Sequence, residues 1–378
     1  MPVRIFYLRG LFRKCGYTEE FIKTISGQGY IFTREVREIF QDQSERLDPT
    51  APVEPENNLE ARKLFFKGQY ILDTLPTRTK LKDDLYRALR FFNSAILKDP
   101  NNAEIYLGSA NCNIYLYNFG YLSREQAYAE CRVICQQAQS VTPKSSHTFS
   151  LRAIITLAFE LNVPKTIKLL LKTIEISPAD SQAYYWLGLC QIFLSNLEEA
   201  RLCFIKASEI EPTNIRLNTT LIRIYYFSED YNKTIAVAKD ILEMENRSYT
   251  ALYFLCLSYA RLGIHSEAVK FCDQLLKVID NDEIRLIKAY LLSLQNQHQE
   301  ANKMIAGILA DEDHLCKRLI YIVLIYVAQK KLDEAFNLLL KYYKKADYDI
   351  LIIKTEPGLK ILRSDKRFHF ILRELSLA

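Results

Sequence analysis

The sequence predicts an all-α protein, an elongated solenoid of about eight helical hairpins, and three observations support this fold class. The chain has 378 residues, enough for two or three globular domains or for one elongated array. It contains only 11 glycines and 11 prolines, which is few for a turn-rich all-β protein. Small and apolar residues recur at intervals of about 34 residues, a period that indicates stacked pairs of helices.

The clearest repeat unit spans residues 181–214. Its small, aromatic and turn-forming residues stand at fixed positions, namely Gly188, Ala200, Phe204, Ala207 and Pro212. Small residues let two antiparallel helices approach closely where they cross, and an aromatic ring fills the gap beside them. The proline ends the second helix because it cannot continue its hydrogen bonding. The unit resembles the tetratricopeptide repeat, a helical hairpin that must stack on neighbours to bury both of its faces.

The same pattern continues along the chain in both directions. Upstream, Pro100 and Pro178 repeat the closing proline. Downstream, the small residue of the second helix, or its substitute, recurs at regular spacing at Thr234, Ala268, Ala301 and Ala335. We therefore predict a repeat array over residues 59–355 and, because residues 356–378 combine many charges with an apolar stripe, capping helices over that last segment.

One predicted unit is longer than the others. It spans residues 101–146, which is 46 residues, and the surplus lies around residues 115–126. Ser123 and Gln126 have the spacing of a capping box, so we expect the second helix of this unit to begin there. The extra length predicts longer helices or a protruding loop.

The amino-terminal residues 1–35 differ from the repeats and carry six basic against three acidic residues. Ile5, Leu8 and Phe12 have the spacing of an apolar helix face. Residues 21–32 contain two β-prone runs around a glycine-containing turn, which predicts a β-hairpin. Residues 36–58 contain three prolines and six acidic against two basic residues, which predicts a partly extended linker.

The order Val-x-Ile-x-x-Leu-Arg at residues 3–9, followed by the hairpin residues 22–32, resembles the recognition helix and wing of an OmpR/ToxR-type winged-helix domain. With the repeats behind it, the chain is similar to the HilA-like transcriptional regulators of invasion genes in enteric bacteria. Met1 falls within the recognition helix of that family, so the resemblance implies a partial winged helix, truncated at its N-terminus. It implies DNA contacts from Arg4, Tyr7, Arg9, Arg13, Lys14, Lys23, Thr24, Gln28 and Tyr30.

Catalytic and metal-binding patterns do not stand out in the sequence. The five histidines are scattered over different repeats, and the nine cysteines include no Cys-x-x-Cys pair. We therefore expect buried free thiols, no catalytic residues, no metal, no cofactor and no enzymatic activity. The sequence also has no apolar run long enough to span a membrane and no signal-peptide pattern, so we expect a cytoplasmic protein.

The resemblance to tetratricopeptide repeats implies a groove lined by the first helix of each unit. We expect this groove to combine aromatic rings with arginines, at Arg152, Tyr185, Trp186, Arg223, Tyr226, Tyr253, Phe254 and Arg261. Rings supply contact area and guanidinium groups bind carboxylates, which predicts an acidic peptide of a protein partner, or another copy of the chain, as the ligand. In the alternative interpretation the rings pack between repeats and the arginines pair with neighbouring glutamates. If the groove binds, replacing Arg223 and Arg261 by glutamate should abolish binding without lowering the melting temperature.

Two functional hypotheses follow from these features. The first is a transcriptional regulator of the HilA-like type, in which the amino-terminal segment binds DNA and the repeats bind a protein. The alternative is a tetratricopeptide scaffold or chaperone-like adaptor that binds only protein and carries a vestigial DNA-binding segment. The net charge of +5 over the whole chain is too weak to indicate nucleic-acid binding by itself.

Overall fold

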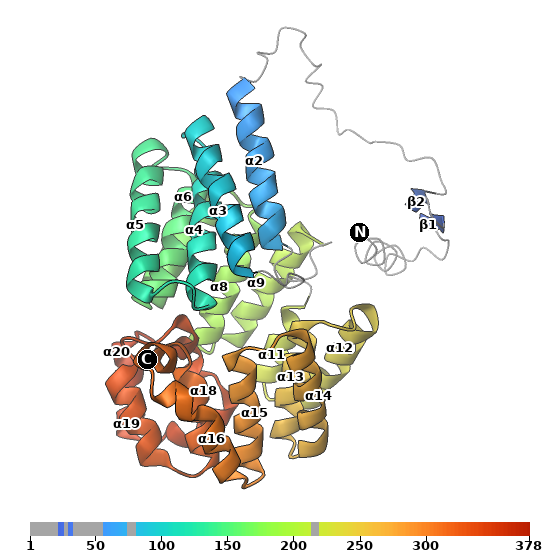
Figure 1. Cartoon of the computed structure of the whole chain (residues 1–378), viewed down its shortest axis with the longest axis vertical. Coiled ribbons are helices and arrows are strands. Elements are labelled where there is room, and N and C mark those ends of the chain that lie inside the picture. The colour runs from blue at the N-terminus through green and yellow to red at the C-terminus, as the bar shows by residue number, and fades with distance from the viewer. Residues whose placement is uncertain (1–21, 26–28, 33–55, 74–80, 213–218) are drawn as a thin grey trace.

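The computed structural model describes residues 22–25, 29–32, 56–73, 81–212 and 219–378, and the longer ranges form an array of antiparallel helices in two parts (Figure 1). The first part contains α2 (Glu56–Asp73), α3 (Leu81–Lys98), α4 (Ala103–Asn118), α5 (Arg124–Val141), α6 (Ser146–Ile155), the short π-helix η2 (Thr156–Glu160), α7 (Val163–Ile176), α8 (Ser181–Phe193) and α9 (Leu197–Ile210). The second part contains α11 (Leu221–Phe227), α12 (Tyr231–Met244), α13 (Tyr249–Arg261), α14 (His265–Val278), α15 (Asp282–Leu294), α16 (His298–Leu309), α17 (Glu312–Lys317), α18 (Leu319–Ala328), α19 (Leu332–Tyr342), the 3-10 helices η3 (Tyr348–Lys354) and η4 (Pro357–Leu362), and α20 (Lys366–Glu374).

The first and second helices of a unit differ sharply in how much of their surface is buried. Nine of the 13 residues of α13 are buried, whereas only four of the 14 residues of α14 are. The pair α15 and α16 shows the same difference, with eight of 13 against three of 12 residues buried. The first helices are therefore covered on both sides, and the second helices form the outer layer with one buried stripe.

The predicted crossing of the helices in unit 181–214 is confirmed. Ala200, Phe204 and Ala207 of α9 are fully buried, and the Phe204 ring lies directly against Gly188 of α8. A methyl group placed on Gly188 would lie 2.5 Å from Cε1 of that ring, which is closer than carbon atoms can approach. Glycine at this position is what allows the two helices to pack at this distance.

The long unit has the predicted capping box and long helices. The Ser123 hydroxyl accepts a hydrogen bond from the Gln126 main-chain N–H at 3.2 Å, and the Gln126 side chain accepts one from the Ser123 N–H at 3.0 Å. These two bonds satisfy amide groups at the start of α5 that have no partner within the helix. With 16 residues in α4 and 18 in α5, much of the surplus length lies in the helices themselves.

The predicted β-hairpin is present near the amino terminus. Strand β1 (Ile22–Ile25) pairs antiparallel with β2 (Gly29–Phe32), and Ile22 is opposite Phe32. Lys23 and Thr24 lie in β1, and Tyr30 lies in β2. Gln28 and the predicted contacts of the recognition helix, Arg4, Tyr7, Arg9, Arg13 and Lys14, lie outside the described residues, as does most of the predicted linker.

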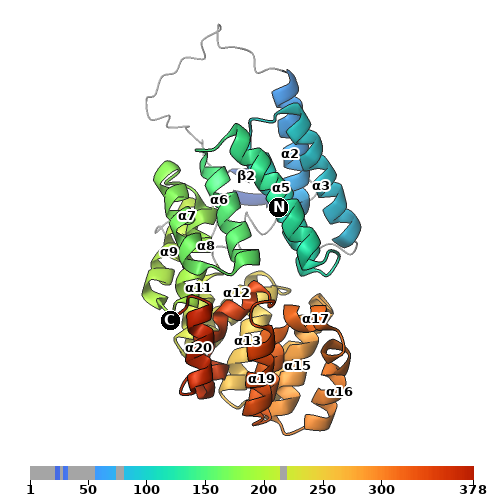
Figure 2. The same cartoon turned by 90° about the vertical axis from the view of Figure 1, so that its left-hand side faces the viewer.

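After α19 the chain turns back across the array. Residues 346–362, here called the return segment, contain η3 and η4 and contact helices that are remote in sequence, including α8 and α18. The chain then ends with α20, which packs on α19. In both views the C-terminus consequently lies about halfway along the long axis, at one side of the molecule and close to the boundary between its two parts (Figures 1 and 2).

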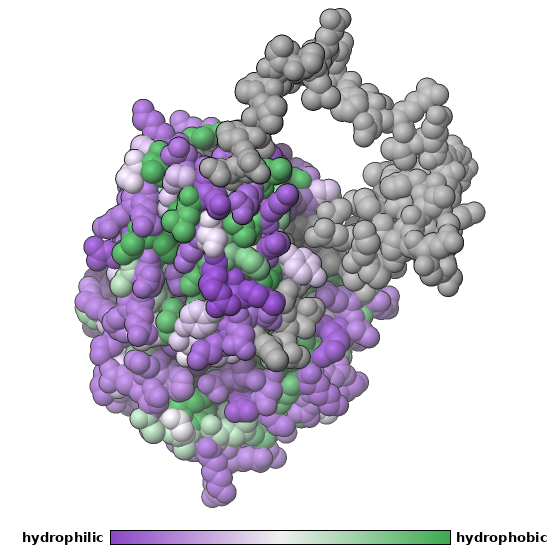
Figure 3. All heavy atoms as spheres, turned by 45° about the horizontal axis from the view of Figure 1, so that its top comes forward, coloured by the Kyte–Doolittle hydropathy of each residue, from purple (hydrophilic) through white to green (hydrophobic). Residues whose placement is uncertain are grey.

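The outer surface is predominantly polar. On the face shown in Figure 3, hydrophilic residues predominate and hydrophobic residues form separate patches. Exposed apolar side chains such as Leu97, Leu171 and Leu202 belong to the second helices of units. None of the helices that the structure describes has the length and hydropathy needed to cross a membrane.

We predict that Gly188→Ala destabilises the protein, because the added methyl group would overlap the Phe204 ring. The expected loss is about 1–3 kcal/mol of unfolding free energy in urea denaturation. Gly307→Ala provides the matched control, since Gly307 lies exposed in α16 and a methyl group there meets nothing within 4 Å. This second variant should be more stable by about 0.5–1 kcal/mol. Equal effects of the two substitutions would contradict the close packing at Gly188.

Candidate functional site

The concave face of the array is occupied by the return segment of the same chain. A cavity of about 300 Å³, partly open to solvent, remains between this segment and the helices α8, α11, α13 and α18. We call it the inner cavity. Because the first helix of each unit supplies one wall and the return segment the other, the candidate site consists of side chains from both.

The return segment is fixed at its beginning by main-chain contacts. The Arg124 guanidinium donates a hydrogen bond of 2.7 Å to the Ala346 carbonyl, and the Asp347 N–H donates to the Cys316 carbonyl at 3.3 Å. The buried Asp347 carboxylate accepts the N–H of Tyr348 at 2.9 Å and so caps η3. Burial raises the pKa of the Asp347 carboxyl, and the hydrogen bond from Tyr348 opposes this rise.

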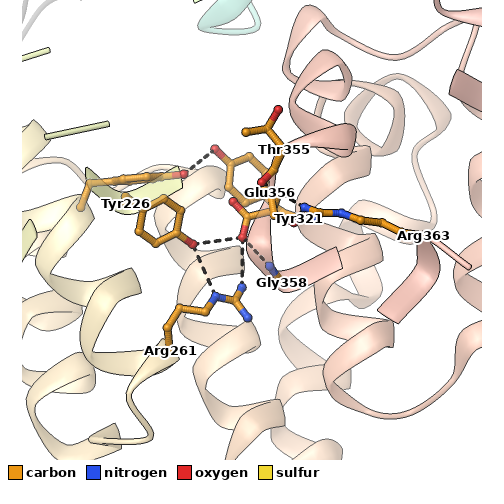
Figure 4. A network of polar contacts seen from close by, with 8 residues as sticks. Tyr226, Arg261, Tyr321, Thr355, Glu356, Gly358 and Arg363 are labelled. Atoms are coloured by element: carbon orange, nitrogen blue, oxygen red, sulfur yellow. Dashed lines mark hydrogen bonds and ion pairs between the residues drawn. The ribbon is translucent and has the colours of Figure 1, made fainter. Parts of the chain in front are cut away.

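The centre of the segment is held by a buried ion pair (Figure 4). Glu356 Oε1 accepts hydrogen bonds from Arg261 Nη2 at 3.1 Å, from the Tyr226 hydroxyl at 3.0 Å and from the Gly358 N–H at 2.9 Å. The Arg261 and Glu356 side chains are only 15% and 6% exposed. Such a charge-assisted cluster is shielded from water and salt, so it is stronger than a surface ion pair.

Gly358 allows the segment to approach this ion pair closely. A methyl group on Gly358 would overlap the Arg261 guanidinium and would lie 2.6 Å from Cδ2 of Leu324. On the other side, Arg363 Nη2 donates to the main-chain carbonyls of Thr355 and Glu356 at 3.1 and 3.2 Å (Figure 4). These contacts fix the turn between η3 and η4.

The segment also contacts the inter-helix turns of two successive units. The Thr355 hydroxyl donates to the Ile192 carbonyl and lies 3.0 Å from the Ser195 hydroxyl. Lys360 Nζ lies 2.9 Å from Glu229 Oε1. Ser195 and Glu229 occupy equivalent turns and both have left-handed backbone angles, with φ of 66° and 61°. The segment thus runs along the array and bridges neighbouring units.

Apolar burial makes the return segment a permanent part of the fold. Five of its leucine and isoleucine side chains are at most 1% exposed, namely Ile350, Leu351, Ile353, Leu359 and Leu362. Burial of each such side chain stabilises the folded state by about 1.5–3 kcal/mol, so releasing all five would cost on the order of 10 kcal/mol. That is comparable to the total stability of a typical domain. The segment is therefore not an exchangeable occupant of the groove.

One wall of the inner cavity is a group of tyrosines around Glu283. Glu283 Oε1 accepts hydrogen bonds from the hydroxyls of Tyr249 at 2.9 Å and Tyr321 at 2.6 Å, and the Tyr321 and Tyr253 hydroxyls are 3.4 Å apart. Burial and the Glu283 charge raise the pKa of all three tyrosines. They remain neutral hydrogen-bond donors at physiological pH.

Two opposite charges face the inner cavity without partners. Among the described residues Arg223 has neither a hydrogen bond nor an ion pair, and its guanidinium lies 5.5 Å from the centre of the Phe254 ring. Asp349 likewise has no ion pair within the described part of the chain. Burial and the charges of Asp347 and Glu283 raise the pKa of the Asp349 carboxyl to about 7, although nearby arginines oppose the rise.

The structure brings most of the predicted groove residues together. Five of them line the inner cavity, namely Tyr185, Arg223, Tyr226, Tyr253 and Phe254. Arg261 binds Glu356 instead. Arg152 and Trp186 are not part of the cavity lining, since Arg152 lies over the Phe149 ring at 5.8 Å and Trp186 packs against the core.

The alternative interpretation of the groove is also partly realised. Tyr226 and Phe254 pack between neighbouring units with ring centres 5.3 Å apart. Arg261 does pair with a glutamate, but with Glu356 of the return segment rather than with one in a neighbouring repeat. We therefore expect replacement of Arg223 and Arg261 by glutamate to lower the melting temperature, because the new charge at Arg261 would face Glu356 in a buried site.

Several residues of the site escaped the sequence-based prediction. They come from the return segment and from the helix starts near it, and comprise Glu283, Arg318, Asp347, Asp349 and Glu356. The available signal was indirect. Residues 319–328 form an uninterrupted apolar run, which indicates a helix buried on every side and hence a covering element over the concave face.

Metal and thiol chemistry find no support in the described part of the chain. No group of three or more His, Cys, Asp or Glu side chains is placed there to hold a metal ion. The eight cysteines described are free, and six of them are buried. Burial raises the pKa of thiols such as those of Cys131 and Cys316, which lowers their reactivity.

Comparison with known proteins agrees with a helical-repeat protein of the tetratricopeptide type. Residues 169–201 match the tetratricopeptide repeat family. Over 356 residues the chain is 22% identical to anaphase-promoting complex subunit 3 of Schizosaccharomyces pombe, covering 92% of this chain and 47% of that protein. The chain therefore spans less than half the length of this relative.

Two solved structures are similar to large parts of the chain. The APC/C hetero-tetramer Cut9–Hcn1 has a TM-score of 0.54 at 12% identity, covering 84% of this chain and 57% of that chain. Yeast Tom70 has a TM-score of 0.46 at 17% identity, covering 86% and 69%. The repeat match and the likeness to Cut9–Hcn1 show that the array is a tetratricopeptide-like solenoid.

The resemblance to HilA-like regulators is wrong. The relative that matches 92% of the chain is a subunit of the anaphase-promoting complex. This match covers more of the chain than the predicted repeat array and its cap, residues 59–378, do together. Strands β1 and β2 do pair, but two short antiparallel strands occur in many folds and do not define a winged helix. The DNA-binding role inferred for the nine amino-terminal residues falls with the resemblance.

We predict that Glu356→Ala strongly destabilises the protein, because it leaves the Arg261 charge buried without its partner. The expected loss is about 3–5 kcal/mol of unfolding free energy, measured by urea denaturation. Glu312→Ala serves as the control, since it breaks an exposed ion pair with Lys345 whose atoms are 2.6 Å apart. That variant should unfold at the wild-type urea concentration. An unchanged urea midpoint for Glu356→Ala would contradict a stabilising role of the buried Arg261–Glu356 pair.

We predict that Asp349→Asn stabilises the protein more at pH 8 than at pH 5. The folded-state pKa of Asp349, about 7, lies above the ordinary value of 3.8. The contribution of this carboxyl to the free energy of unfolding is therefore greatest below pH 3.8 and is lost as the pH rises to 7. Asparagine removes this loss, so its stabilisation relative to the wild type should be about 2.5 kcal/mol larger at pH 8 than at pH 5.

Thermal melts at the two pH values test this. Asp240→Asn, on the exposed face of α12, is the control and should leave both melting temperatures unchanged. A gain for Asp349→Asn that is equal at both pH values would contradict a titrating Asp349 in the cavity.

Proposed function

We propose that this protein is a scaffold or adaptor that binds another protein through the part of its concave groove that the return segment leaves open. The solenoid fold supports this, because a stack of helical hairpins presents a long concave surface for polypeptide binding. The inner cavity lies on that surface and is partly open to solvent. Its walls combine aromatic rings with arginines, a composition common at the centre of protein interfaces.

The observation that carries the proposal is the way in which the groove holds the return segment. Arg261 and Tyr226 bind the Glu356 carboxylate of the segment. Two inter-helix turns bind it as well, Ser195 through Thr355 and Glu229 through Lys360. These are the contacts by which a protein surface recognises a peptide, with main-chain and charged groups fixed at several points. The inner cavity offers further groups of the same kinds beside the segment.

The comparisons agree with a role in protein assembly. One relative is named as a subunit of the anaphase-promoting complex, and one similar structure is a hetero-tetramer. Because this chain spans less than half of the relative, we transfer only the general role of binding proteins.

Site-specific photo-crosslinking in cells that express the full chain tests this function. A photo-reactive amino acid replaces Thr250, which lines the inner cavity, or Leu202, which lies 55% exposed on the outer helix α9. We expect a discrete adduct with one protein, identified by mass spectrometry, from position 250 and not from position 202. In the Arg223→Glu background the adduct should disappear, because the reversed charge alters the cavity wall.

The outcomes distinguish the inner cavity from the outer helices as the binding surface. Adducts from position 202 alone would place the binding surface on the outer helices and contradict the groove. The absence of adducts from both positions would contradict the role as a protein-binding scaffold. Circular dichroism melts of each variant distinguish a lost contact from a lost fold.

A further inference from the structure

The inner cavity holds two opposite charges that form no hydrogen bond or ion pair within the described residues. Arg223 extends from α11 and Asp349 from η3, on opposite walls of the same cavity of about 300 Å³. Within the described residues no ion pair joins them, so their charged atoms are more than 4 Å apart. Every other carboxylate in the return segment has a hydrogen-bond donor, as Asp347 and Glu356 show. Arg223 and Asp349 are therefore available to a ligand.

The charges around the cavity restrict the class of ligand. An apolar ligand would displace water from Arg223 and Asp349 and leave both charges without a partner. A ligand with only negative charge would meet Glu283 and Asp347 as well as Asp349. A ligand with only positive charge would meet Arg223 and Arg318. A zwitterionic ligand, with one group of each sign, compensates the charge on both walls.

We propose that the inner cavity binds a zwitterionic element of a partner peptide, whose acidic side chain pairs with Arg223 and whose neighbouring basic side chain pairs with Asp349. This inference rests on the proposed protein-binding function and names the chemistry of the partner. The cavity lies at the lower end of the size range of ligand sites, which suits two side chains and excludes a whole helix. The rings of Tyr253, Phe254 and Tyr348 line the cavity and can contact the aliphatic parts of the two peptide side chains.

Binding of such a peptide has a distinct proton signature. The pKa of Asp349 is about 7, so this carboxyl is half protonated near neutral pH. An incoming cation favours its ionised form, and binding at pH 7 should release a proton. The charged groups that face Asp349 come from several elements and comprise Asp347, Glu283, Arg318 and Arg223. An incoming carboxylate that pairs with Arg223 reduces the help this arginine gives Asp349, so proton release depends on the basic side chain.

Titration calorimetry on the full chain with synthetic peptides tests the inference. The probes are alanine peptides that contain Glu and Lys separated by zero, one or two alanines, together with matched Glu–Gln and Gln–Lys peptides. We expect the best Glu–Lys peptide to bind at least about tenfold more tightly than either single-charge control. Its binding enthalpy at pH 7 should vary with the ionisation enthalpy of the buffer, which reports proton release.

Variants of the two cavity charges assign the contacts. With Arg223→Gln, the protein should no longer bind the Glu–Lys peptide more tightly than the Gln–Lys peptide. With Asp349→Asn, it should no longer bind the Glu–Lys peptide more tightly than the Glu–Gln peptide, and the proton release should disappear. Asp240→Asn, on the outer face of α12, should bind all peptides as wild type does. Retention of both preferences in the cavity variants would overturn the assignment.

Equal affinity for all three peptide classes, or binding of none of them, would overturn the inference. If photo-crosslinking at position 250 captures a partner while the peptide titrations give that result, the proposed protein-binding function stands and only the zwitterionic chemistry of the partner is rejected. If free lysine or glutamate binds as tightly as the peptides, the cavity is a small-molecule site and the peptide source is rejected.

Discussion

The covering of the apolar inner helices is the constraint on which the rest of this structure depends. Helix α18 reads Leu-Ile-Tyr-Ile-Val-Leu-Ile-Tyr-Val-Ala, and seven of its ten residues are buried. Helices α13 and α15 are also buried around most of their circumference. An open solenoid would expose one side of these helices to water, at a large cost in hydrophobic free energy. The return segment removes that exposure, because Leu351 and Ile353 of η3 bury themselves completely.

Covering the concave face also buries polar groups, and the structure provides Asp347, Arg261 and Glu356 with hydrogen-bond partners. The 3-10 helices have weaker internal hydrogen bonding than α-helices, so capping by Asp347 and Glu356 matters for their ends. Arg261 is better suited than a lysine to the central position, because its planar guanidinium contacts Glu356 and Tyr226 together. In the low dielectric of this site such bonds are stronger than in water, and an unpaired group is correspondingly costly.

The repeats could be predicted from sequence because their signals are local. The crossing of α8 and α9 requires a small residue at Gly188 and a ring at Phe204, and the start of α5 requires a cap at Ser123, so each appears in the amino-acid pattern. The return segment could not be predicted in the same way. Its central ion pair joins Arg261 and Glu356, which are 95 positions apart. An apolar helix indicates burial without indicating what covers it. The winged-helix interpretation failed because a short hairpin motif carries too little information to identify a fold.

Arg223 and Asp349 are the residues that structural closure of the groove does not explain. Apolar side chains at both positions would fill the inner cavity, extend the packing between η3 and the inner helices, and avoid the burial of unpaired charge. Burial, together with the charges of Asp347 and Glu283, raises the pKa of the Asp349 carboxyl to about 7. A protein tolerates such a local loss of stability where the groups serve binding, since the same desolvation that makes them costly when free strengthens their contacts to a complementary ligand. The cavity is thus better understood as a binding site that the return segment completes than as a packing defect that it leaves behind.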